Sequence, residues 1–162
     1  MLKSTRLAIV LLTLFVHSVV GASTVIVNPF RCEMSATAEQ QLSAGVYLNF
    51  SITNLTKQPL KLLTWYTPFE GFLSKLFIIK DNEGKPLTYH GIMVKRLTPT
   101  AEDYLVLPPK EKIAITLNLT KAYSLTSGKY SVQLAPKSWQ YLQGKSQLTS
   151  QCLVHPLNIN IR

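Results

Sequence analysis

The chain has 162 residues, with 17 Lys and Arg against 8 Asp and Glu, which gives a formal net charge of +9. Hydrophobic residues make up 46% of it, and it contains 9 Pro, 7 Gly and two Cys. This composition excludes a disordered chain, a collagen-like fibre and a Cys-rich mini-protein, and the length suits one globular domain.

The first 22 residues have the three-part layout of a secretory signal peptide. Lys3 and Arg6 precede an apolar run from Leu7 to Val16, and small residues close the segment at Ala22. The run is about ten residues long, well short of the ~20 that a membrane-spanning helix needs. We therefore expect cleavage after Ala22, export to the periplasm or the medium without stable membrane anchoring, and a single domain over residues 23–162.

The remaining 140 residues carry a net charge of +7. Such a charge favours acidic partners or anionic surfaces. The basic residues are scattered singly, however, and the only adjacent pair after residue 22 is Lys95-Arg96. Because an exported protein rarely meets nucleic acid and no basic stripe is visible, we do not expect nucleic-acid binding.

The two cysteines stand near the ends of the exported chain, at Cys32 and Cys152. In an oxidising compartment this arrangement predicts a disulfide that pins the first strand to the last. Closing a loop of about 120 residues adds on the order of 4–5 kcal/mol in the chain-entropy model. The alternative is a metal site formed by both cysteines with His90 and His155, although strand residues three positions apart point to opposite faces.

Apolar residues alternate with polar ones along most of the chain, which is the period of β-strands. The alternation is complete from Val46 to Thr53 and from Ile113 to Thr120. Shorter or unbroken apolar runs predict four further strands, at 60–65, 76–79, 130–134 and 157–161. One face of such a sheet is buried and the other is wet, as in antiparallel sandwiches.

Turn-forming residues separate these runs at 54–59, 81–85, 108–109 and 127–128. The 81–85 segment predicts a hairpin in which Gly84 takes a positive φ. We expect one short helical turn over 98–104, with Thr98 as the cap and Pro99 in the first position. The segment 138–143 is a second candidate for a helical turn.

One local pattern narrows the kind of sandwich. Gly128 stands two residues before Tyr130 at the start of an alternating strand, like the tyrosine corner of immunoglobulin-like domains. We therefore predict an all-β fold, an immunoglobulin-like antiparallel β-sandwich of about seven to nine strands with at most one or two short helical turns.

Motifs of catalytic chemistry are missing from the sequence. It contains no His-Glu-x-x-His, no Gly-x-Ser-x-Gly, no phosphate loop and no dinucleotide fingerprint. The adjacent carboxylates Glu102 and Asp103 point apart in a strand and do not supply the facing pair of a glycosidase. We therefore expect a protein that is not an enzyme and that needs no cofactor or metal.

Two loop segments are unusual for such a scaffold. The segment 65–72 packs four aromatic residues with Pro68 and Gly71 into eight positions, which suits a contact surface; alternatively, Trp65 and Phe72 belong to the core and the rest is a tight turn. The second segment, 91–96, ends in the basic pair, which either pairs with a carboxylate of a partner or lies on a solvated strand edge.

These segments together resemble a known family, the N-terminal prodomain of bacterial deuterolysin-type (aspzincin) metalloendopeptidases. The resemblance runs from about Val46 to Leu134 and is carried by their order and spacing: Phe50-Ser51-Ile52-Thr53-Asn54, Leu63-Thr64-Trp65-Tyr66-Thr67-Pro68-Phe69-Glu70-Gly71, Gly91-Ile92-Met93-Val94-Lys95-Arg96, Pro99-Thr100-Ala101-Glu102-Asp103-Tyr104, and Leu119 to Leu125 with Gly128 to Val132. In that family a zinc protease domain follows, and we expect this chain to lack it.

The resemblance implies an inhibitor or propeptide-like chaperone that binds a secreted metalloprotease and covers its cleft. Its matched positions supply the expected partner-binding residues, with the last two as support: Thr67, Pro68, Phe69, Glu70, Gly71, Lys95, Arg96, Asp103 and Tyr104. Glu70 is either a zinc ligand toward the partner or a residue that fixes the Thr-Pro turn.

Two other functions remain open. A general immunoglobulin-like binding module of the cell envelope would add a partner's strand to a free sheet edge, in adhesion or assembly. An exported metal-binding protein would take up zinc or copper. Neither the identity of a partner nor the oligomeric state follows from the sequence.

Overall fold

The structure is a computed structural model that describes residues 28–162. The predicted signal peptide lies outside the described residues. The described part contains no α-helix, and its elements are eleven strands and four three-residue 3-10 turns. The strands are β1 (Phe30–Ser35), β2 (Glu39–Gln40), β3 (Tyr47–Asn54), β4 (Leu60–Leu63), β5 (Phe77–Asp81), β6 (Tyr104–Leu107), β7 (Lys112–Asn118), β8 (Gly128–Leu134), β9 (Ser138–Gln143), β10 (Ser146–Gln151) and β11 (Leu157–Ile161).

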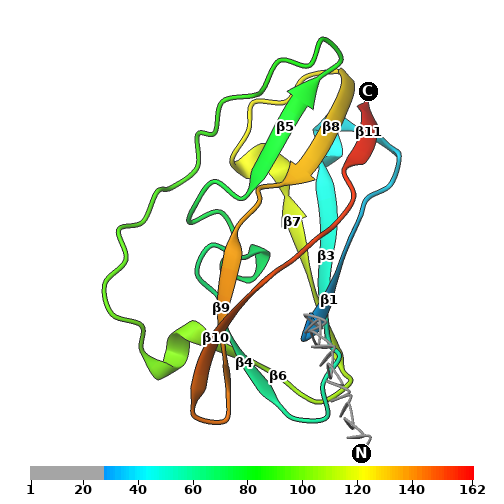
Figure 1. The fold of residues 1–162 in the computed structure, drawn as a ribbon. Coiled ribbons are helices and arrows are strands. Elements are labelled where there is room, and N and C mark those ends of the chain that lie inside the picture. Colours follow the sequence, from blue (N-terminus) through cyan, green and yellow to red (C-terminus); the bar gives the residue numbers. More distant parts are fainter. Residues whose placement is uncertain (1–27) are drawn as a thin grey trace, which may run out of the picture.

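The strands form three sheets, ordered β1-β3-β7, β10-β9-β4-β6 and β2-β11-β8-β5. Neighbouring strands are antiparallel except β2, which pairs parallel with β11. In Figure 1, β8 runs on into β9, so the two four-stranded sheets follow one another along the molecule beside β3 and β7. This confirms the predicted all-β, sandwich-like fold.

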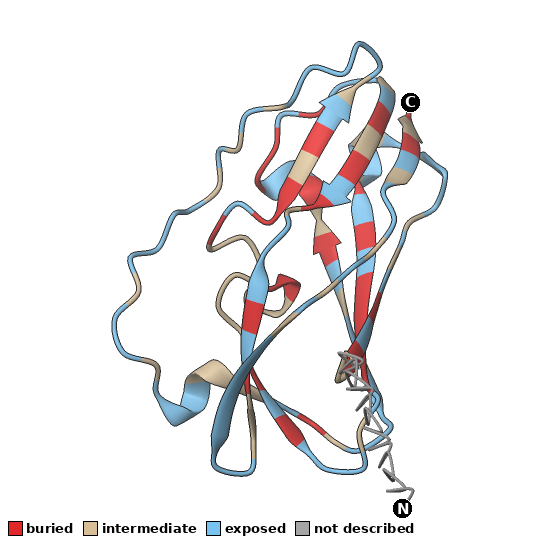
Figure 2. Ribbon diagram, viewed as in Figure 1, coloured by how far each residue is buried: buried red, intermediate tan, exposed pale blue. Residues whose placement is uncertain are grey.

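The core between the sheets is built largely from the alternating apolar residues. Phe30 and Phe50, from β1 and β3, face two aromatic residues of β9. The Phe50 ring lies 5.9 Å from that of Trp139, and the Phe30 ring lies 5.9 Å from that of Tyr141, both edge to face. Figure 2 shows the buried positions alternating along β5 and β8, whereas β3 is buried without interruption from Phe50 to Asn54. The sheets are therefore held together by apolar side chains that the strands bury against one another.

The tyrosine corner is present at the start of β8. The Tyr130 hydroxyl donates to Thr126 O at 3.2 Å and accepts from Thr126 N at 3.3 Å. The ring is buried, so these bonds satisfy a hydroxyl that would otherwise be desolvated without partners. The local pattern that predicted the corner was therefore read correctly.

The disulfide joins Cys32 and Cys152, with the two Cα atoms 5.6 Å apart. The predicted pairing is confirmed, but its placement differs from the prediction. Cys152 follows β10 directly and precedes β11, so the bond ties β1 to the end of the β9–β10 hairpin rather than to the last strand. Because both thiols are used in this bond, the alternative metal site loses two of its four ligands.

The helical turns depart from the sequence prediction. They are η1 (Leu42–Ala44), η2 (Pro68–Glu70), η3 (Ala101–Asp103) and η4 (Leu119–Lys121), four rather than one or two. The cap of η3 is Thr100 and not Thr98, because Thr100 and Asp103 form a reciprocal capping box. The segment 138–143 is strand β9 and not a helical turn, since its aromatic residues alternate inward with period two. The strand count also exceeds the predicted seven to nine, through the two-residue β2 and the β9–β10 hairpin.

No helix within residues 28–162 is long and apolar enough to cross a membrane.

Candidate functional site: a braced turn and an exposed apolar strap

The Thr-Pro turn follows β4 and is fixed by local hydrogen bonds. Thr67 N and Oγ1 both donate to Thr64 O, at 3.0 and 2.6 Å, and Oγ1 also accepts from Phe69 N at 3.3 Å. Thr67 thereby caps η2, whose first residue is Pro68. Gly71 ends the turn at φ 71°, a conformation that glycine adopts without a Cβ clash.

Burial divides the predicted contact residues of this turn. Thr67 and Pro68 are buried, so they shape the turn from inside. Phe69 is half-buried and packs its ring edge to face against Phe50 at 5.6 Å. The alternative interpretation of this segment assigned Trp65 and Phe72 to the core. For Phe72 it matches the structure, because Phe72 packs against the buried hydrophobic cluster.

Glu70 lies at the centre of the turn and is almost fully buried. Its Oε1 accepts from Tyr66 N at 2.8 Å and from Ser74 Oγ at 2.9 Å, and its Oε2 pairs with Arg96. The Glu70 side chain is 4% exposed and that of Arg96 is 16% exposed. Of the two roles considered for Glu70, the structure supports the one that fixes the turn, because its carboxylate is used in contacts with Tyr66, Ser74 and Arg96 of the same chain.

Arg96 connects this turn to the long loop that follows β5. Its guanidinium carbon lies 5.2 Å from the centre of the Trp65 ring, over the ring face. For the basic pair Lys95-Arg96, the sequence left two roles open, pairing with a carboxylate of a partner or lying on a solvated strand edge. In the structure the two side chains have different environments. Arg96 pairs with a carboxylate of its own chain, whereas Lys95 is exposed.

Asp103 braces the same cluster from η3. Its Oδ1 accepts from Trp65 Nε1 at 2.8 Å, and its Oδ2 accepts from Thr100 N and Oγ1 at 2.7 and 2.9 Å. These bonds, above all the one from the Thr100 backbone, lower the pKa of the Asp103 carboxyl. Tyr104 starts β6 and pairs with Leu63 of β4. The sequence-predicted residues Glu70, Arg96 and Asp103 therefore meet around Trp65.

The loop between β5 and η3 carries a run of exposed apolar side chains. We call residues Gly91–Leu97 the apolar strap. Ile92, Met93 and Leu97 are 63%, 71% and 89% exposed, and Val94 is also exposed. Figure 1 shows this loop running down one edge of the molecule, and Figure 2 shows no buried position between residues 82 and 100. Apolar side chains concentrated on one exposed segment mark an interaction surface more often than scattered ones do.

Backbone and side-chain bonds fix the strap along its length. Val94 N donates to Leu73 O at 3.1 Å, and His90 N donates to Ala122 O at 2.9 Å. The Tyr89 hydroxyl lies 2.9 Å from Phe72 O and 3.0 Å from Ile92 O, between the turn and the strap. Burial, with the nearby charge of Glu70, raises the pKa of Tyr89, which favours the protonated hydroxyl that donates in this position. The strap is thus exposed and also held in one conformation.

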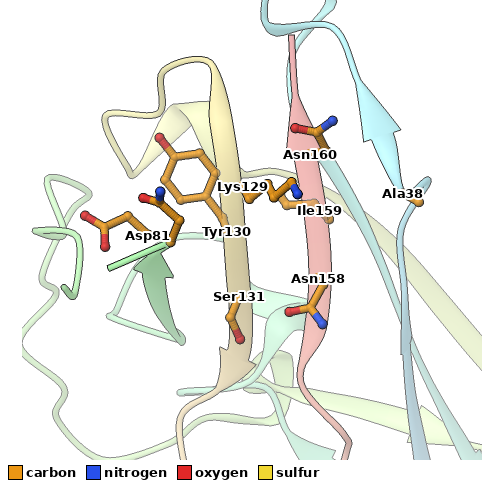
Figure 3. Close-up of a pocket in the computed structure, with 9 residues that line it drawn as sticks. Ala38, Asp81, Lys129, Tyr130, Ser131, Asn158, Ile159 and Asn160 are labelled. Carbon is orange, nitrogen blue, oxygen red and sulfur yellow. The ribbon is translucent and has the colours of Figure 1, made fainter. Parts of the chain in front are cut away.

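A second surface feature is a hollow at the β2-β11-β8-β5 sheet, lined by polar and apolar residues. Figure 3 shows Lys129 and Ser131 of β8 beside Asn158 and Asn160 of β11, which are opposite them in the strand register. The hollow has a volume of about 520 Å³. Besides Ala38, Tyr130 and Ile159, its lining residues supply amides, the Ser131 hydroxyl, one ammonium and the carboxylate of Asp81, with no nucleophile–base pair.

Within residues 28–162, no three His, Cys, Asp or Glu side chains gather to bind a metal ion. His90 and His155, the histidines of the alternative metal site, are both exposed.

Several residues of the cluster have no signal in the sequence analysis: Ser74, Tyr89 and Lys137, whose ammonium lies over the Tyr66 ring. Thr100 is different, because the spacing Thr100-x-x-Asp103 is that of a capping box and was available to sequence reasoning.

Comparison with known proteins gives one relative in sequence. No family model matches the chain. An "Extracellular protease" of Aeromonas hydrophila is 25% identical over 138 residues, which cover 82% of this chain and 36% of that protein. The chain therefore spans about a third of the length of this relative, and its similarity is to part of an extracellular protease.

Solved structures are similar only at a low level. Native alpha-2-macroglobulin of Escherichia coli, from domain MG7 to the C-terminus, gives a TM-score of 0.40 at 16% identity over 83% of this chain and 17% of that one. A beta-glucosidase of Listeria innocua in complex with isofagomine gives 0.36 at 11% identity, over 83% and 16% of the two chains. TM-scores this low carry no information on function.

Proposed function

We propose that this chain is an exported, non-catalytic domain that inhibits a secreted zinc metalloendopeptidase of the deuterolysin type, or assists its folding, by placing the apolar strap in the protease cleft. The observation that carries the proposal is the strap itself, in which Ile92, Met93 and Leu97 are exposed on a backbone fixed by hydrogen bonds. A pre-organised apolar segment loses little conformational entropy on binding, which favours affinity.

Three further observations support the proposal. The relative from Aeromonas hydrophila is an extracellular protease, and this chain matches about a third of it. The disulfide suits an exported protein. The residues that carry the resemblance to a protease prodomain, Glu70, Arg96 and Asp103, brace the strap and the Thr-Pro turn. In this proposal they act as positioning residues, while the strap makes the contact.

The test measures inhibition of a purified deuterolysin-type protease by the purified chain. The double variant Ile92→Asp/Met93→Asp places two charges on the strap without altering a buried residue, and we expect it to raise the inhibition constant at least about tenfold, equivalent to about 1.4 kcal/mol. Leu153→Asp is the matched control, because Leu153 is 76% exposed and lies outside the strap. We expect the control to inhibit like the unchanged chain.

The same experiment distinguishes a second function. Strand β10 pairs with β9 on one side, no other described strand covers its outer edge, and its sequence Ser146–Gln151 lacks both charge and proline. Such an edge is open to strand addition, the mode of a general immunoglobulin-like binding module. If a complex forms that Thr149→Pro abolishes and the strap variant leaves unchanged, the binding module is the better description. If the chain neither inhibits the protease nor binds it in gel filtration, the proposed inhibitor function is wrong.

A further inference from the structure

A pocket of about 370 Å³ opens where the Thr-Pro turn, the end of the strap and the start of β9 meet. Its walls include two aromatic residues, two cations, an exposed leucine and a hydroxyl: Trp65, Tyr66, Arg96, Lys137, Leu97 and Ser138. None of the residues that line it carries a carboxylate. The pocket is therefore apolar on its sides and positively charged.

Tyr66 has an unusual backbone conformation in this pocket. Its φ is 62°, a left-handed value that costs a residue other than glycine on the order of 1–3 kcal/mol. The turn enforces this conformation, since Tyr66 N donates to the buried Glu70 carboxylate and Thr67 closes on Thr64 O. Strained residues that the surroundings hold in place are concentrated at binding and catalytic sites.

The strained backbone places the Tyr66 ring beneath a cation. Lys137 Nζ lies 3.3 Å from the centre of that ring and forms no ion pair with any residue from 28 to 162. An ammonium has three donors, and a ring face satisfies only part of this capacity. Lys137 is exposed, so its remaining donors are accessible from the pocket.

The second cation also has unused donor capacity. Arg96 pairs with Glu70 on one side, but its Nε is buried and has no hydrogen-bond partner in the described part of the chain. Unpartnered buried donors are rare in folded proteins and call for an explanation. Both cations thus lie against aromatic rings, and each has at least one donor without a hydrogen-bond acceptor in the described part of the chain.

We propose that this pocket binds a side-chain carboxylate, that of a Glu residue on the partner surface. The carboxylate accepts from Lys137 Nζ, and its aliphatic stem packs against the faces of Trp65 and Tyr66. The neighbouring Leu97, 89% exposed, then contacts an apolar residue next to that Glu. The identity of the partner rests on the proposed function, whereas the chemistry of the pocket does not.

The test uses short peptides and does not depend on a protease. The probe is acetyl-Leu-Glu-amide, and the acetyl-Leu-Gln-amide peptide has the same shape without the charge. Binding to the purified chain is followed by NMR at the amides of Tyr66 and Ser138 and at the indole N–H of Trp65. We expect saturable shifts with the Glu peptide and about fivefold weaker binding of the Gln peptide, the size of one partly exposed ion pair.

Two variants of the pocket and one control make the assignment specific. Lys137→Met keeps the aliphatic stem and loses the charge, so we expect the preference for Glu over Gln to disappear; Lys137→Arg should retain it. Lys145→Met removes another exposed lysine, in the turn between β9 and β10, and should bind like the unchanged chain.

Three results would overturn the proposal: equal binding of the two peptides, a preference for Glu that survives in Lys137→Met, or binding of acetyl-Leu-Leu-OH in place of the Glu peptide, which would assign the pocket to a chain terminus. Selective binding of the Glu peptide without protease inhibition would support the assignment of the pocket and contradict the proposed function. Protease inhibition without peptide selectivity would reject the pocket alone.

Discussion

The aromatic wall between the sheets (Phe30, Phe50, Phe69, Trp139 and Tyr141) and the apolar strap at the edge are both rich in apolar side chains, yet they are stabilised in different ways. Phe50 of the wall is fully buried and its ring contacts those of Phe69 and Trp139. The strap has no buried residue, and hydrogen bonds with one ion pair keep it in place. The wall therefore depends on burial, and the strap depends on a few polar contacts, two of which come from the distant residues Glu70 and Leu73.

The contrast between the wall and the strap shows how a small β domain can present apolar groups to a partner. Burial of the strap against its own sheet would stabilise the domain but would hide Ile92 and Met93. Polar anchors on the inner side, Glu70 with Arg96 and Leu73 O with Val94 N, leave the apolar side chains outside. Single substitutions in the wall, at the Glu70 anchor and at Asp103 should separate the two modes of stabilisation.

The largest effect is expected in the wall. Phe50→Ala leaves a cavity between β3 and β9, and we expect the free energy of unfolding to fall by about 3–5 kcal/mol. Urea unfolding followed by tryptophan fluorescence measures this, with Tyr47→Ala as a control on the exposed face of the same strand. A loss below about 1 kcal/mol would mean that the wall does not carry the stability of the fold.

At the ion pair of Glu70 and Arg96, which anchors the strap, we expect a smaller loss of unfolding free energy but a clear change in local hydrogen exchange. Glu70→Gln keeps an acceptor for Tyr66 N and removes the charge that pairs with Arg96. Because Arg96 lies on a surface loop and its side chain is already 16% exposed, we expect the guanidinium to move into water, and the loss of stability to be about 1–2 kcal/mol rather than the 3–5 kcal/mol of a fully trapped charge. We also expect hydrogen exchange at Val94 N to become at least about tenfold faster, which reports local opening.

The control for this anchor is Glu33→Gln, which also removes a carboxylate from an ion pair. Glu33 pairs with Lys112 on the surface, where both side chains are about half exposed. We expect no measurable change in unfolding or in exchange of the strap. If Glu70→Gln behaved like this control, the strap would not depend on the ion pair and the comparison drawn here would fail.

The wall could be predicted from the sequence to a large extent, whereas the anchor could not. Period-two alternation located β3 and β7, and the Gly128 and Tyr130 pattern located the corner, because both signals are local. The spacing of Trp139 and Tyr141 has the same period and indicates a strand. The helical turn expected at 138–143 is therefore wrong for a reason that the sequence already contained.

The anchor depends on contacts between residues far apart in the chain. Glu70 and Arg96 are 26 positions apart, and the path of the intervening loop decides whether they meet. The placement of Lys137 on Tyr66 likewise follows from how β9 lies beside the Thr-Pro turn. The sequence indicated Glu70 and Arg96 as important, through a resemblance, but it did not indicate that they pair with each other.

The smallest effect concerns pH and the brace at η3. The pKa of Asp103 is lowered below its ordinary value of 3.8, first by the bond from Thr100 N and then by that from Trp65 Nε1. A carboxyl whose folded pKa is below its unfolded one stabilises the fold above the unfolded value, near pH 4, and loses this contribution as the pH falls through the folded pKa. We therefore expect the stability of Asp103→Asn to depend less on pH between pH 4 and pH 2 than that of the unchanged chain.

Urea midpoints across this range measure the difference, and Glu102→Gln, an exposed neighbour, should keep the original dependence. Parallel curves for Asp103→Asn and the unchanged chain would show that the charge of Asp103 contributes nothing to stability, and that the Thr-Pro turn and the strap are fixed by their other contacts, those of Thr67, Glu70 and Leu73.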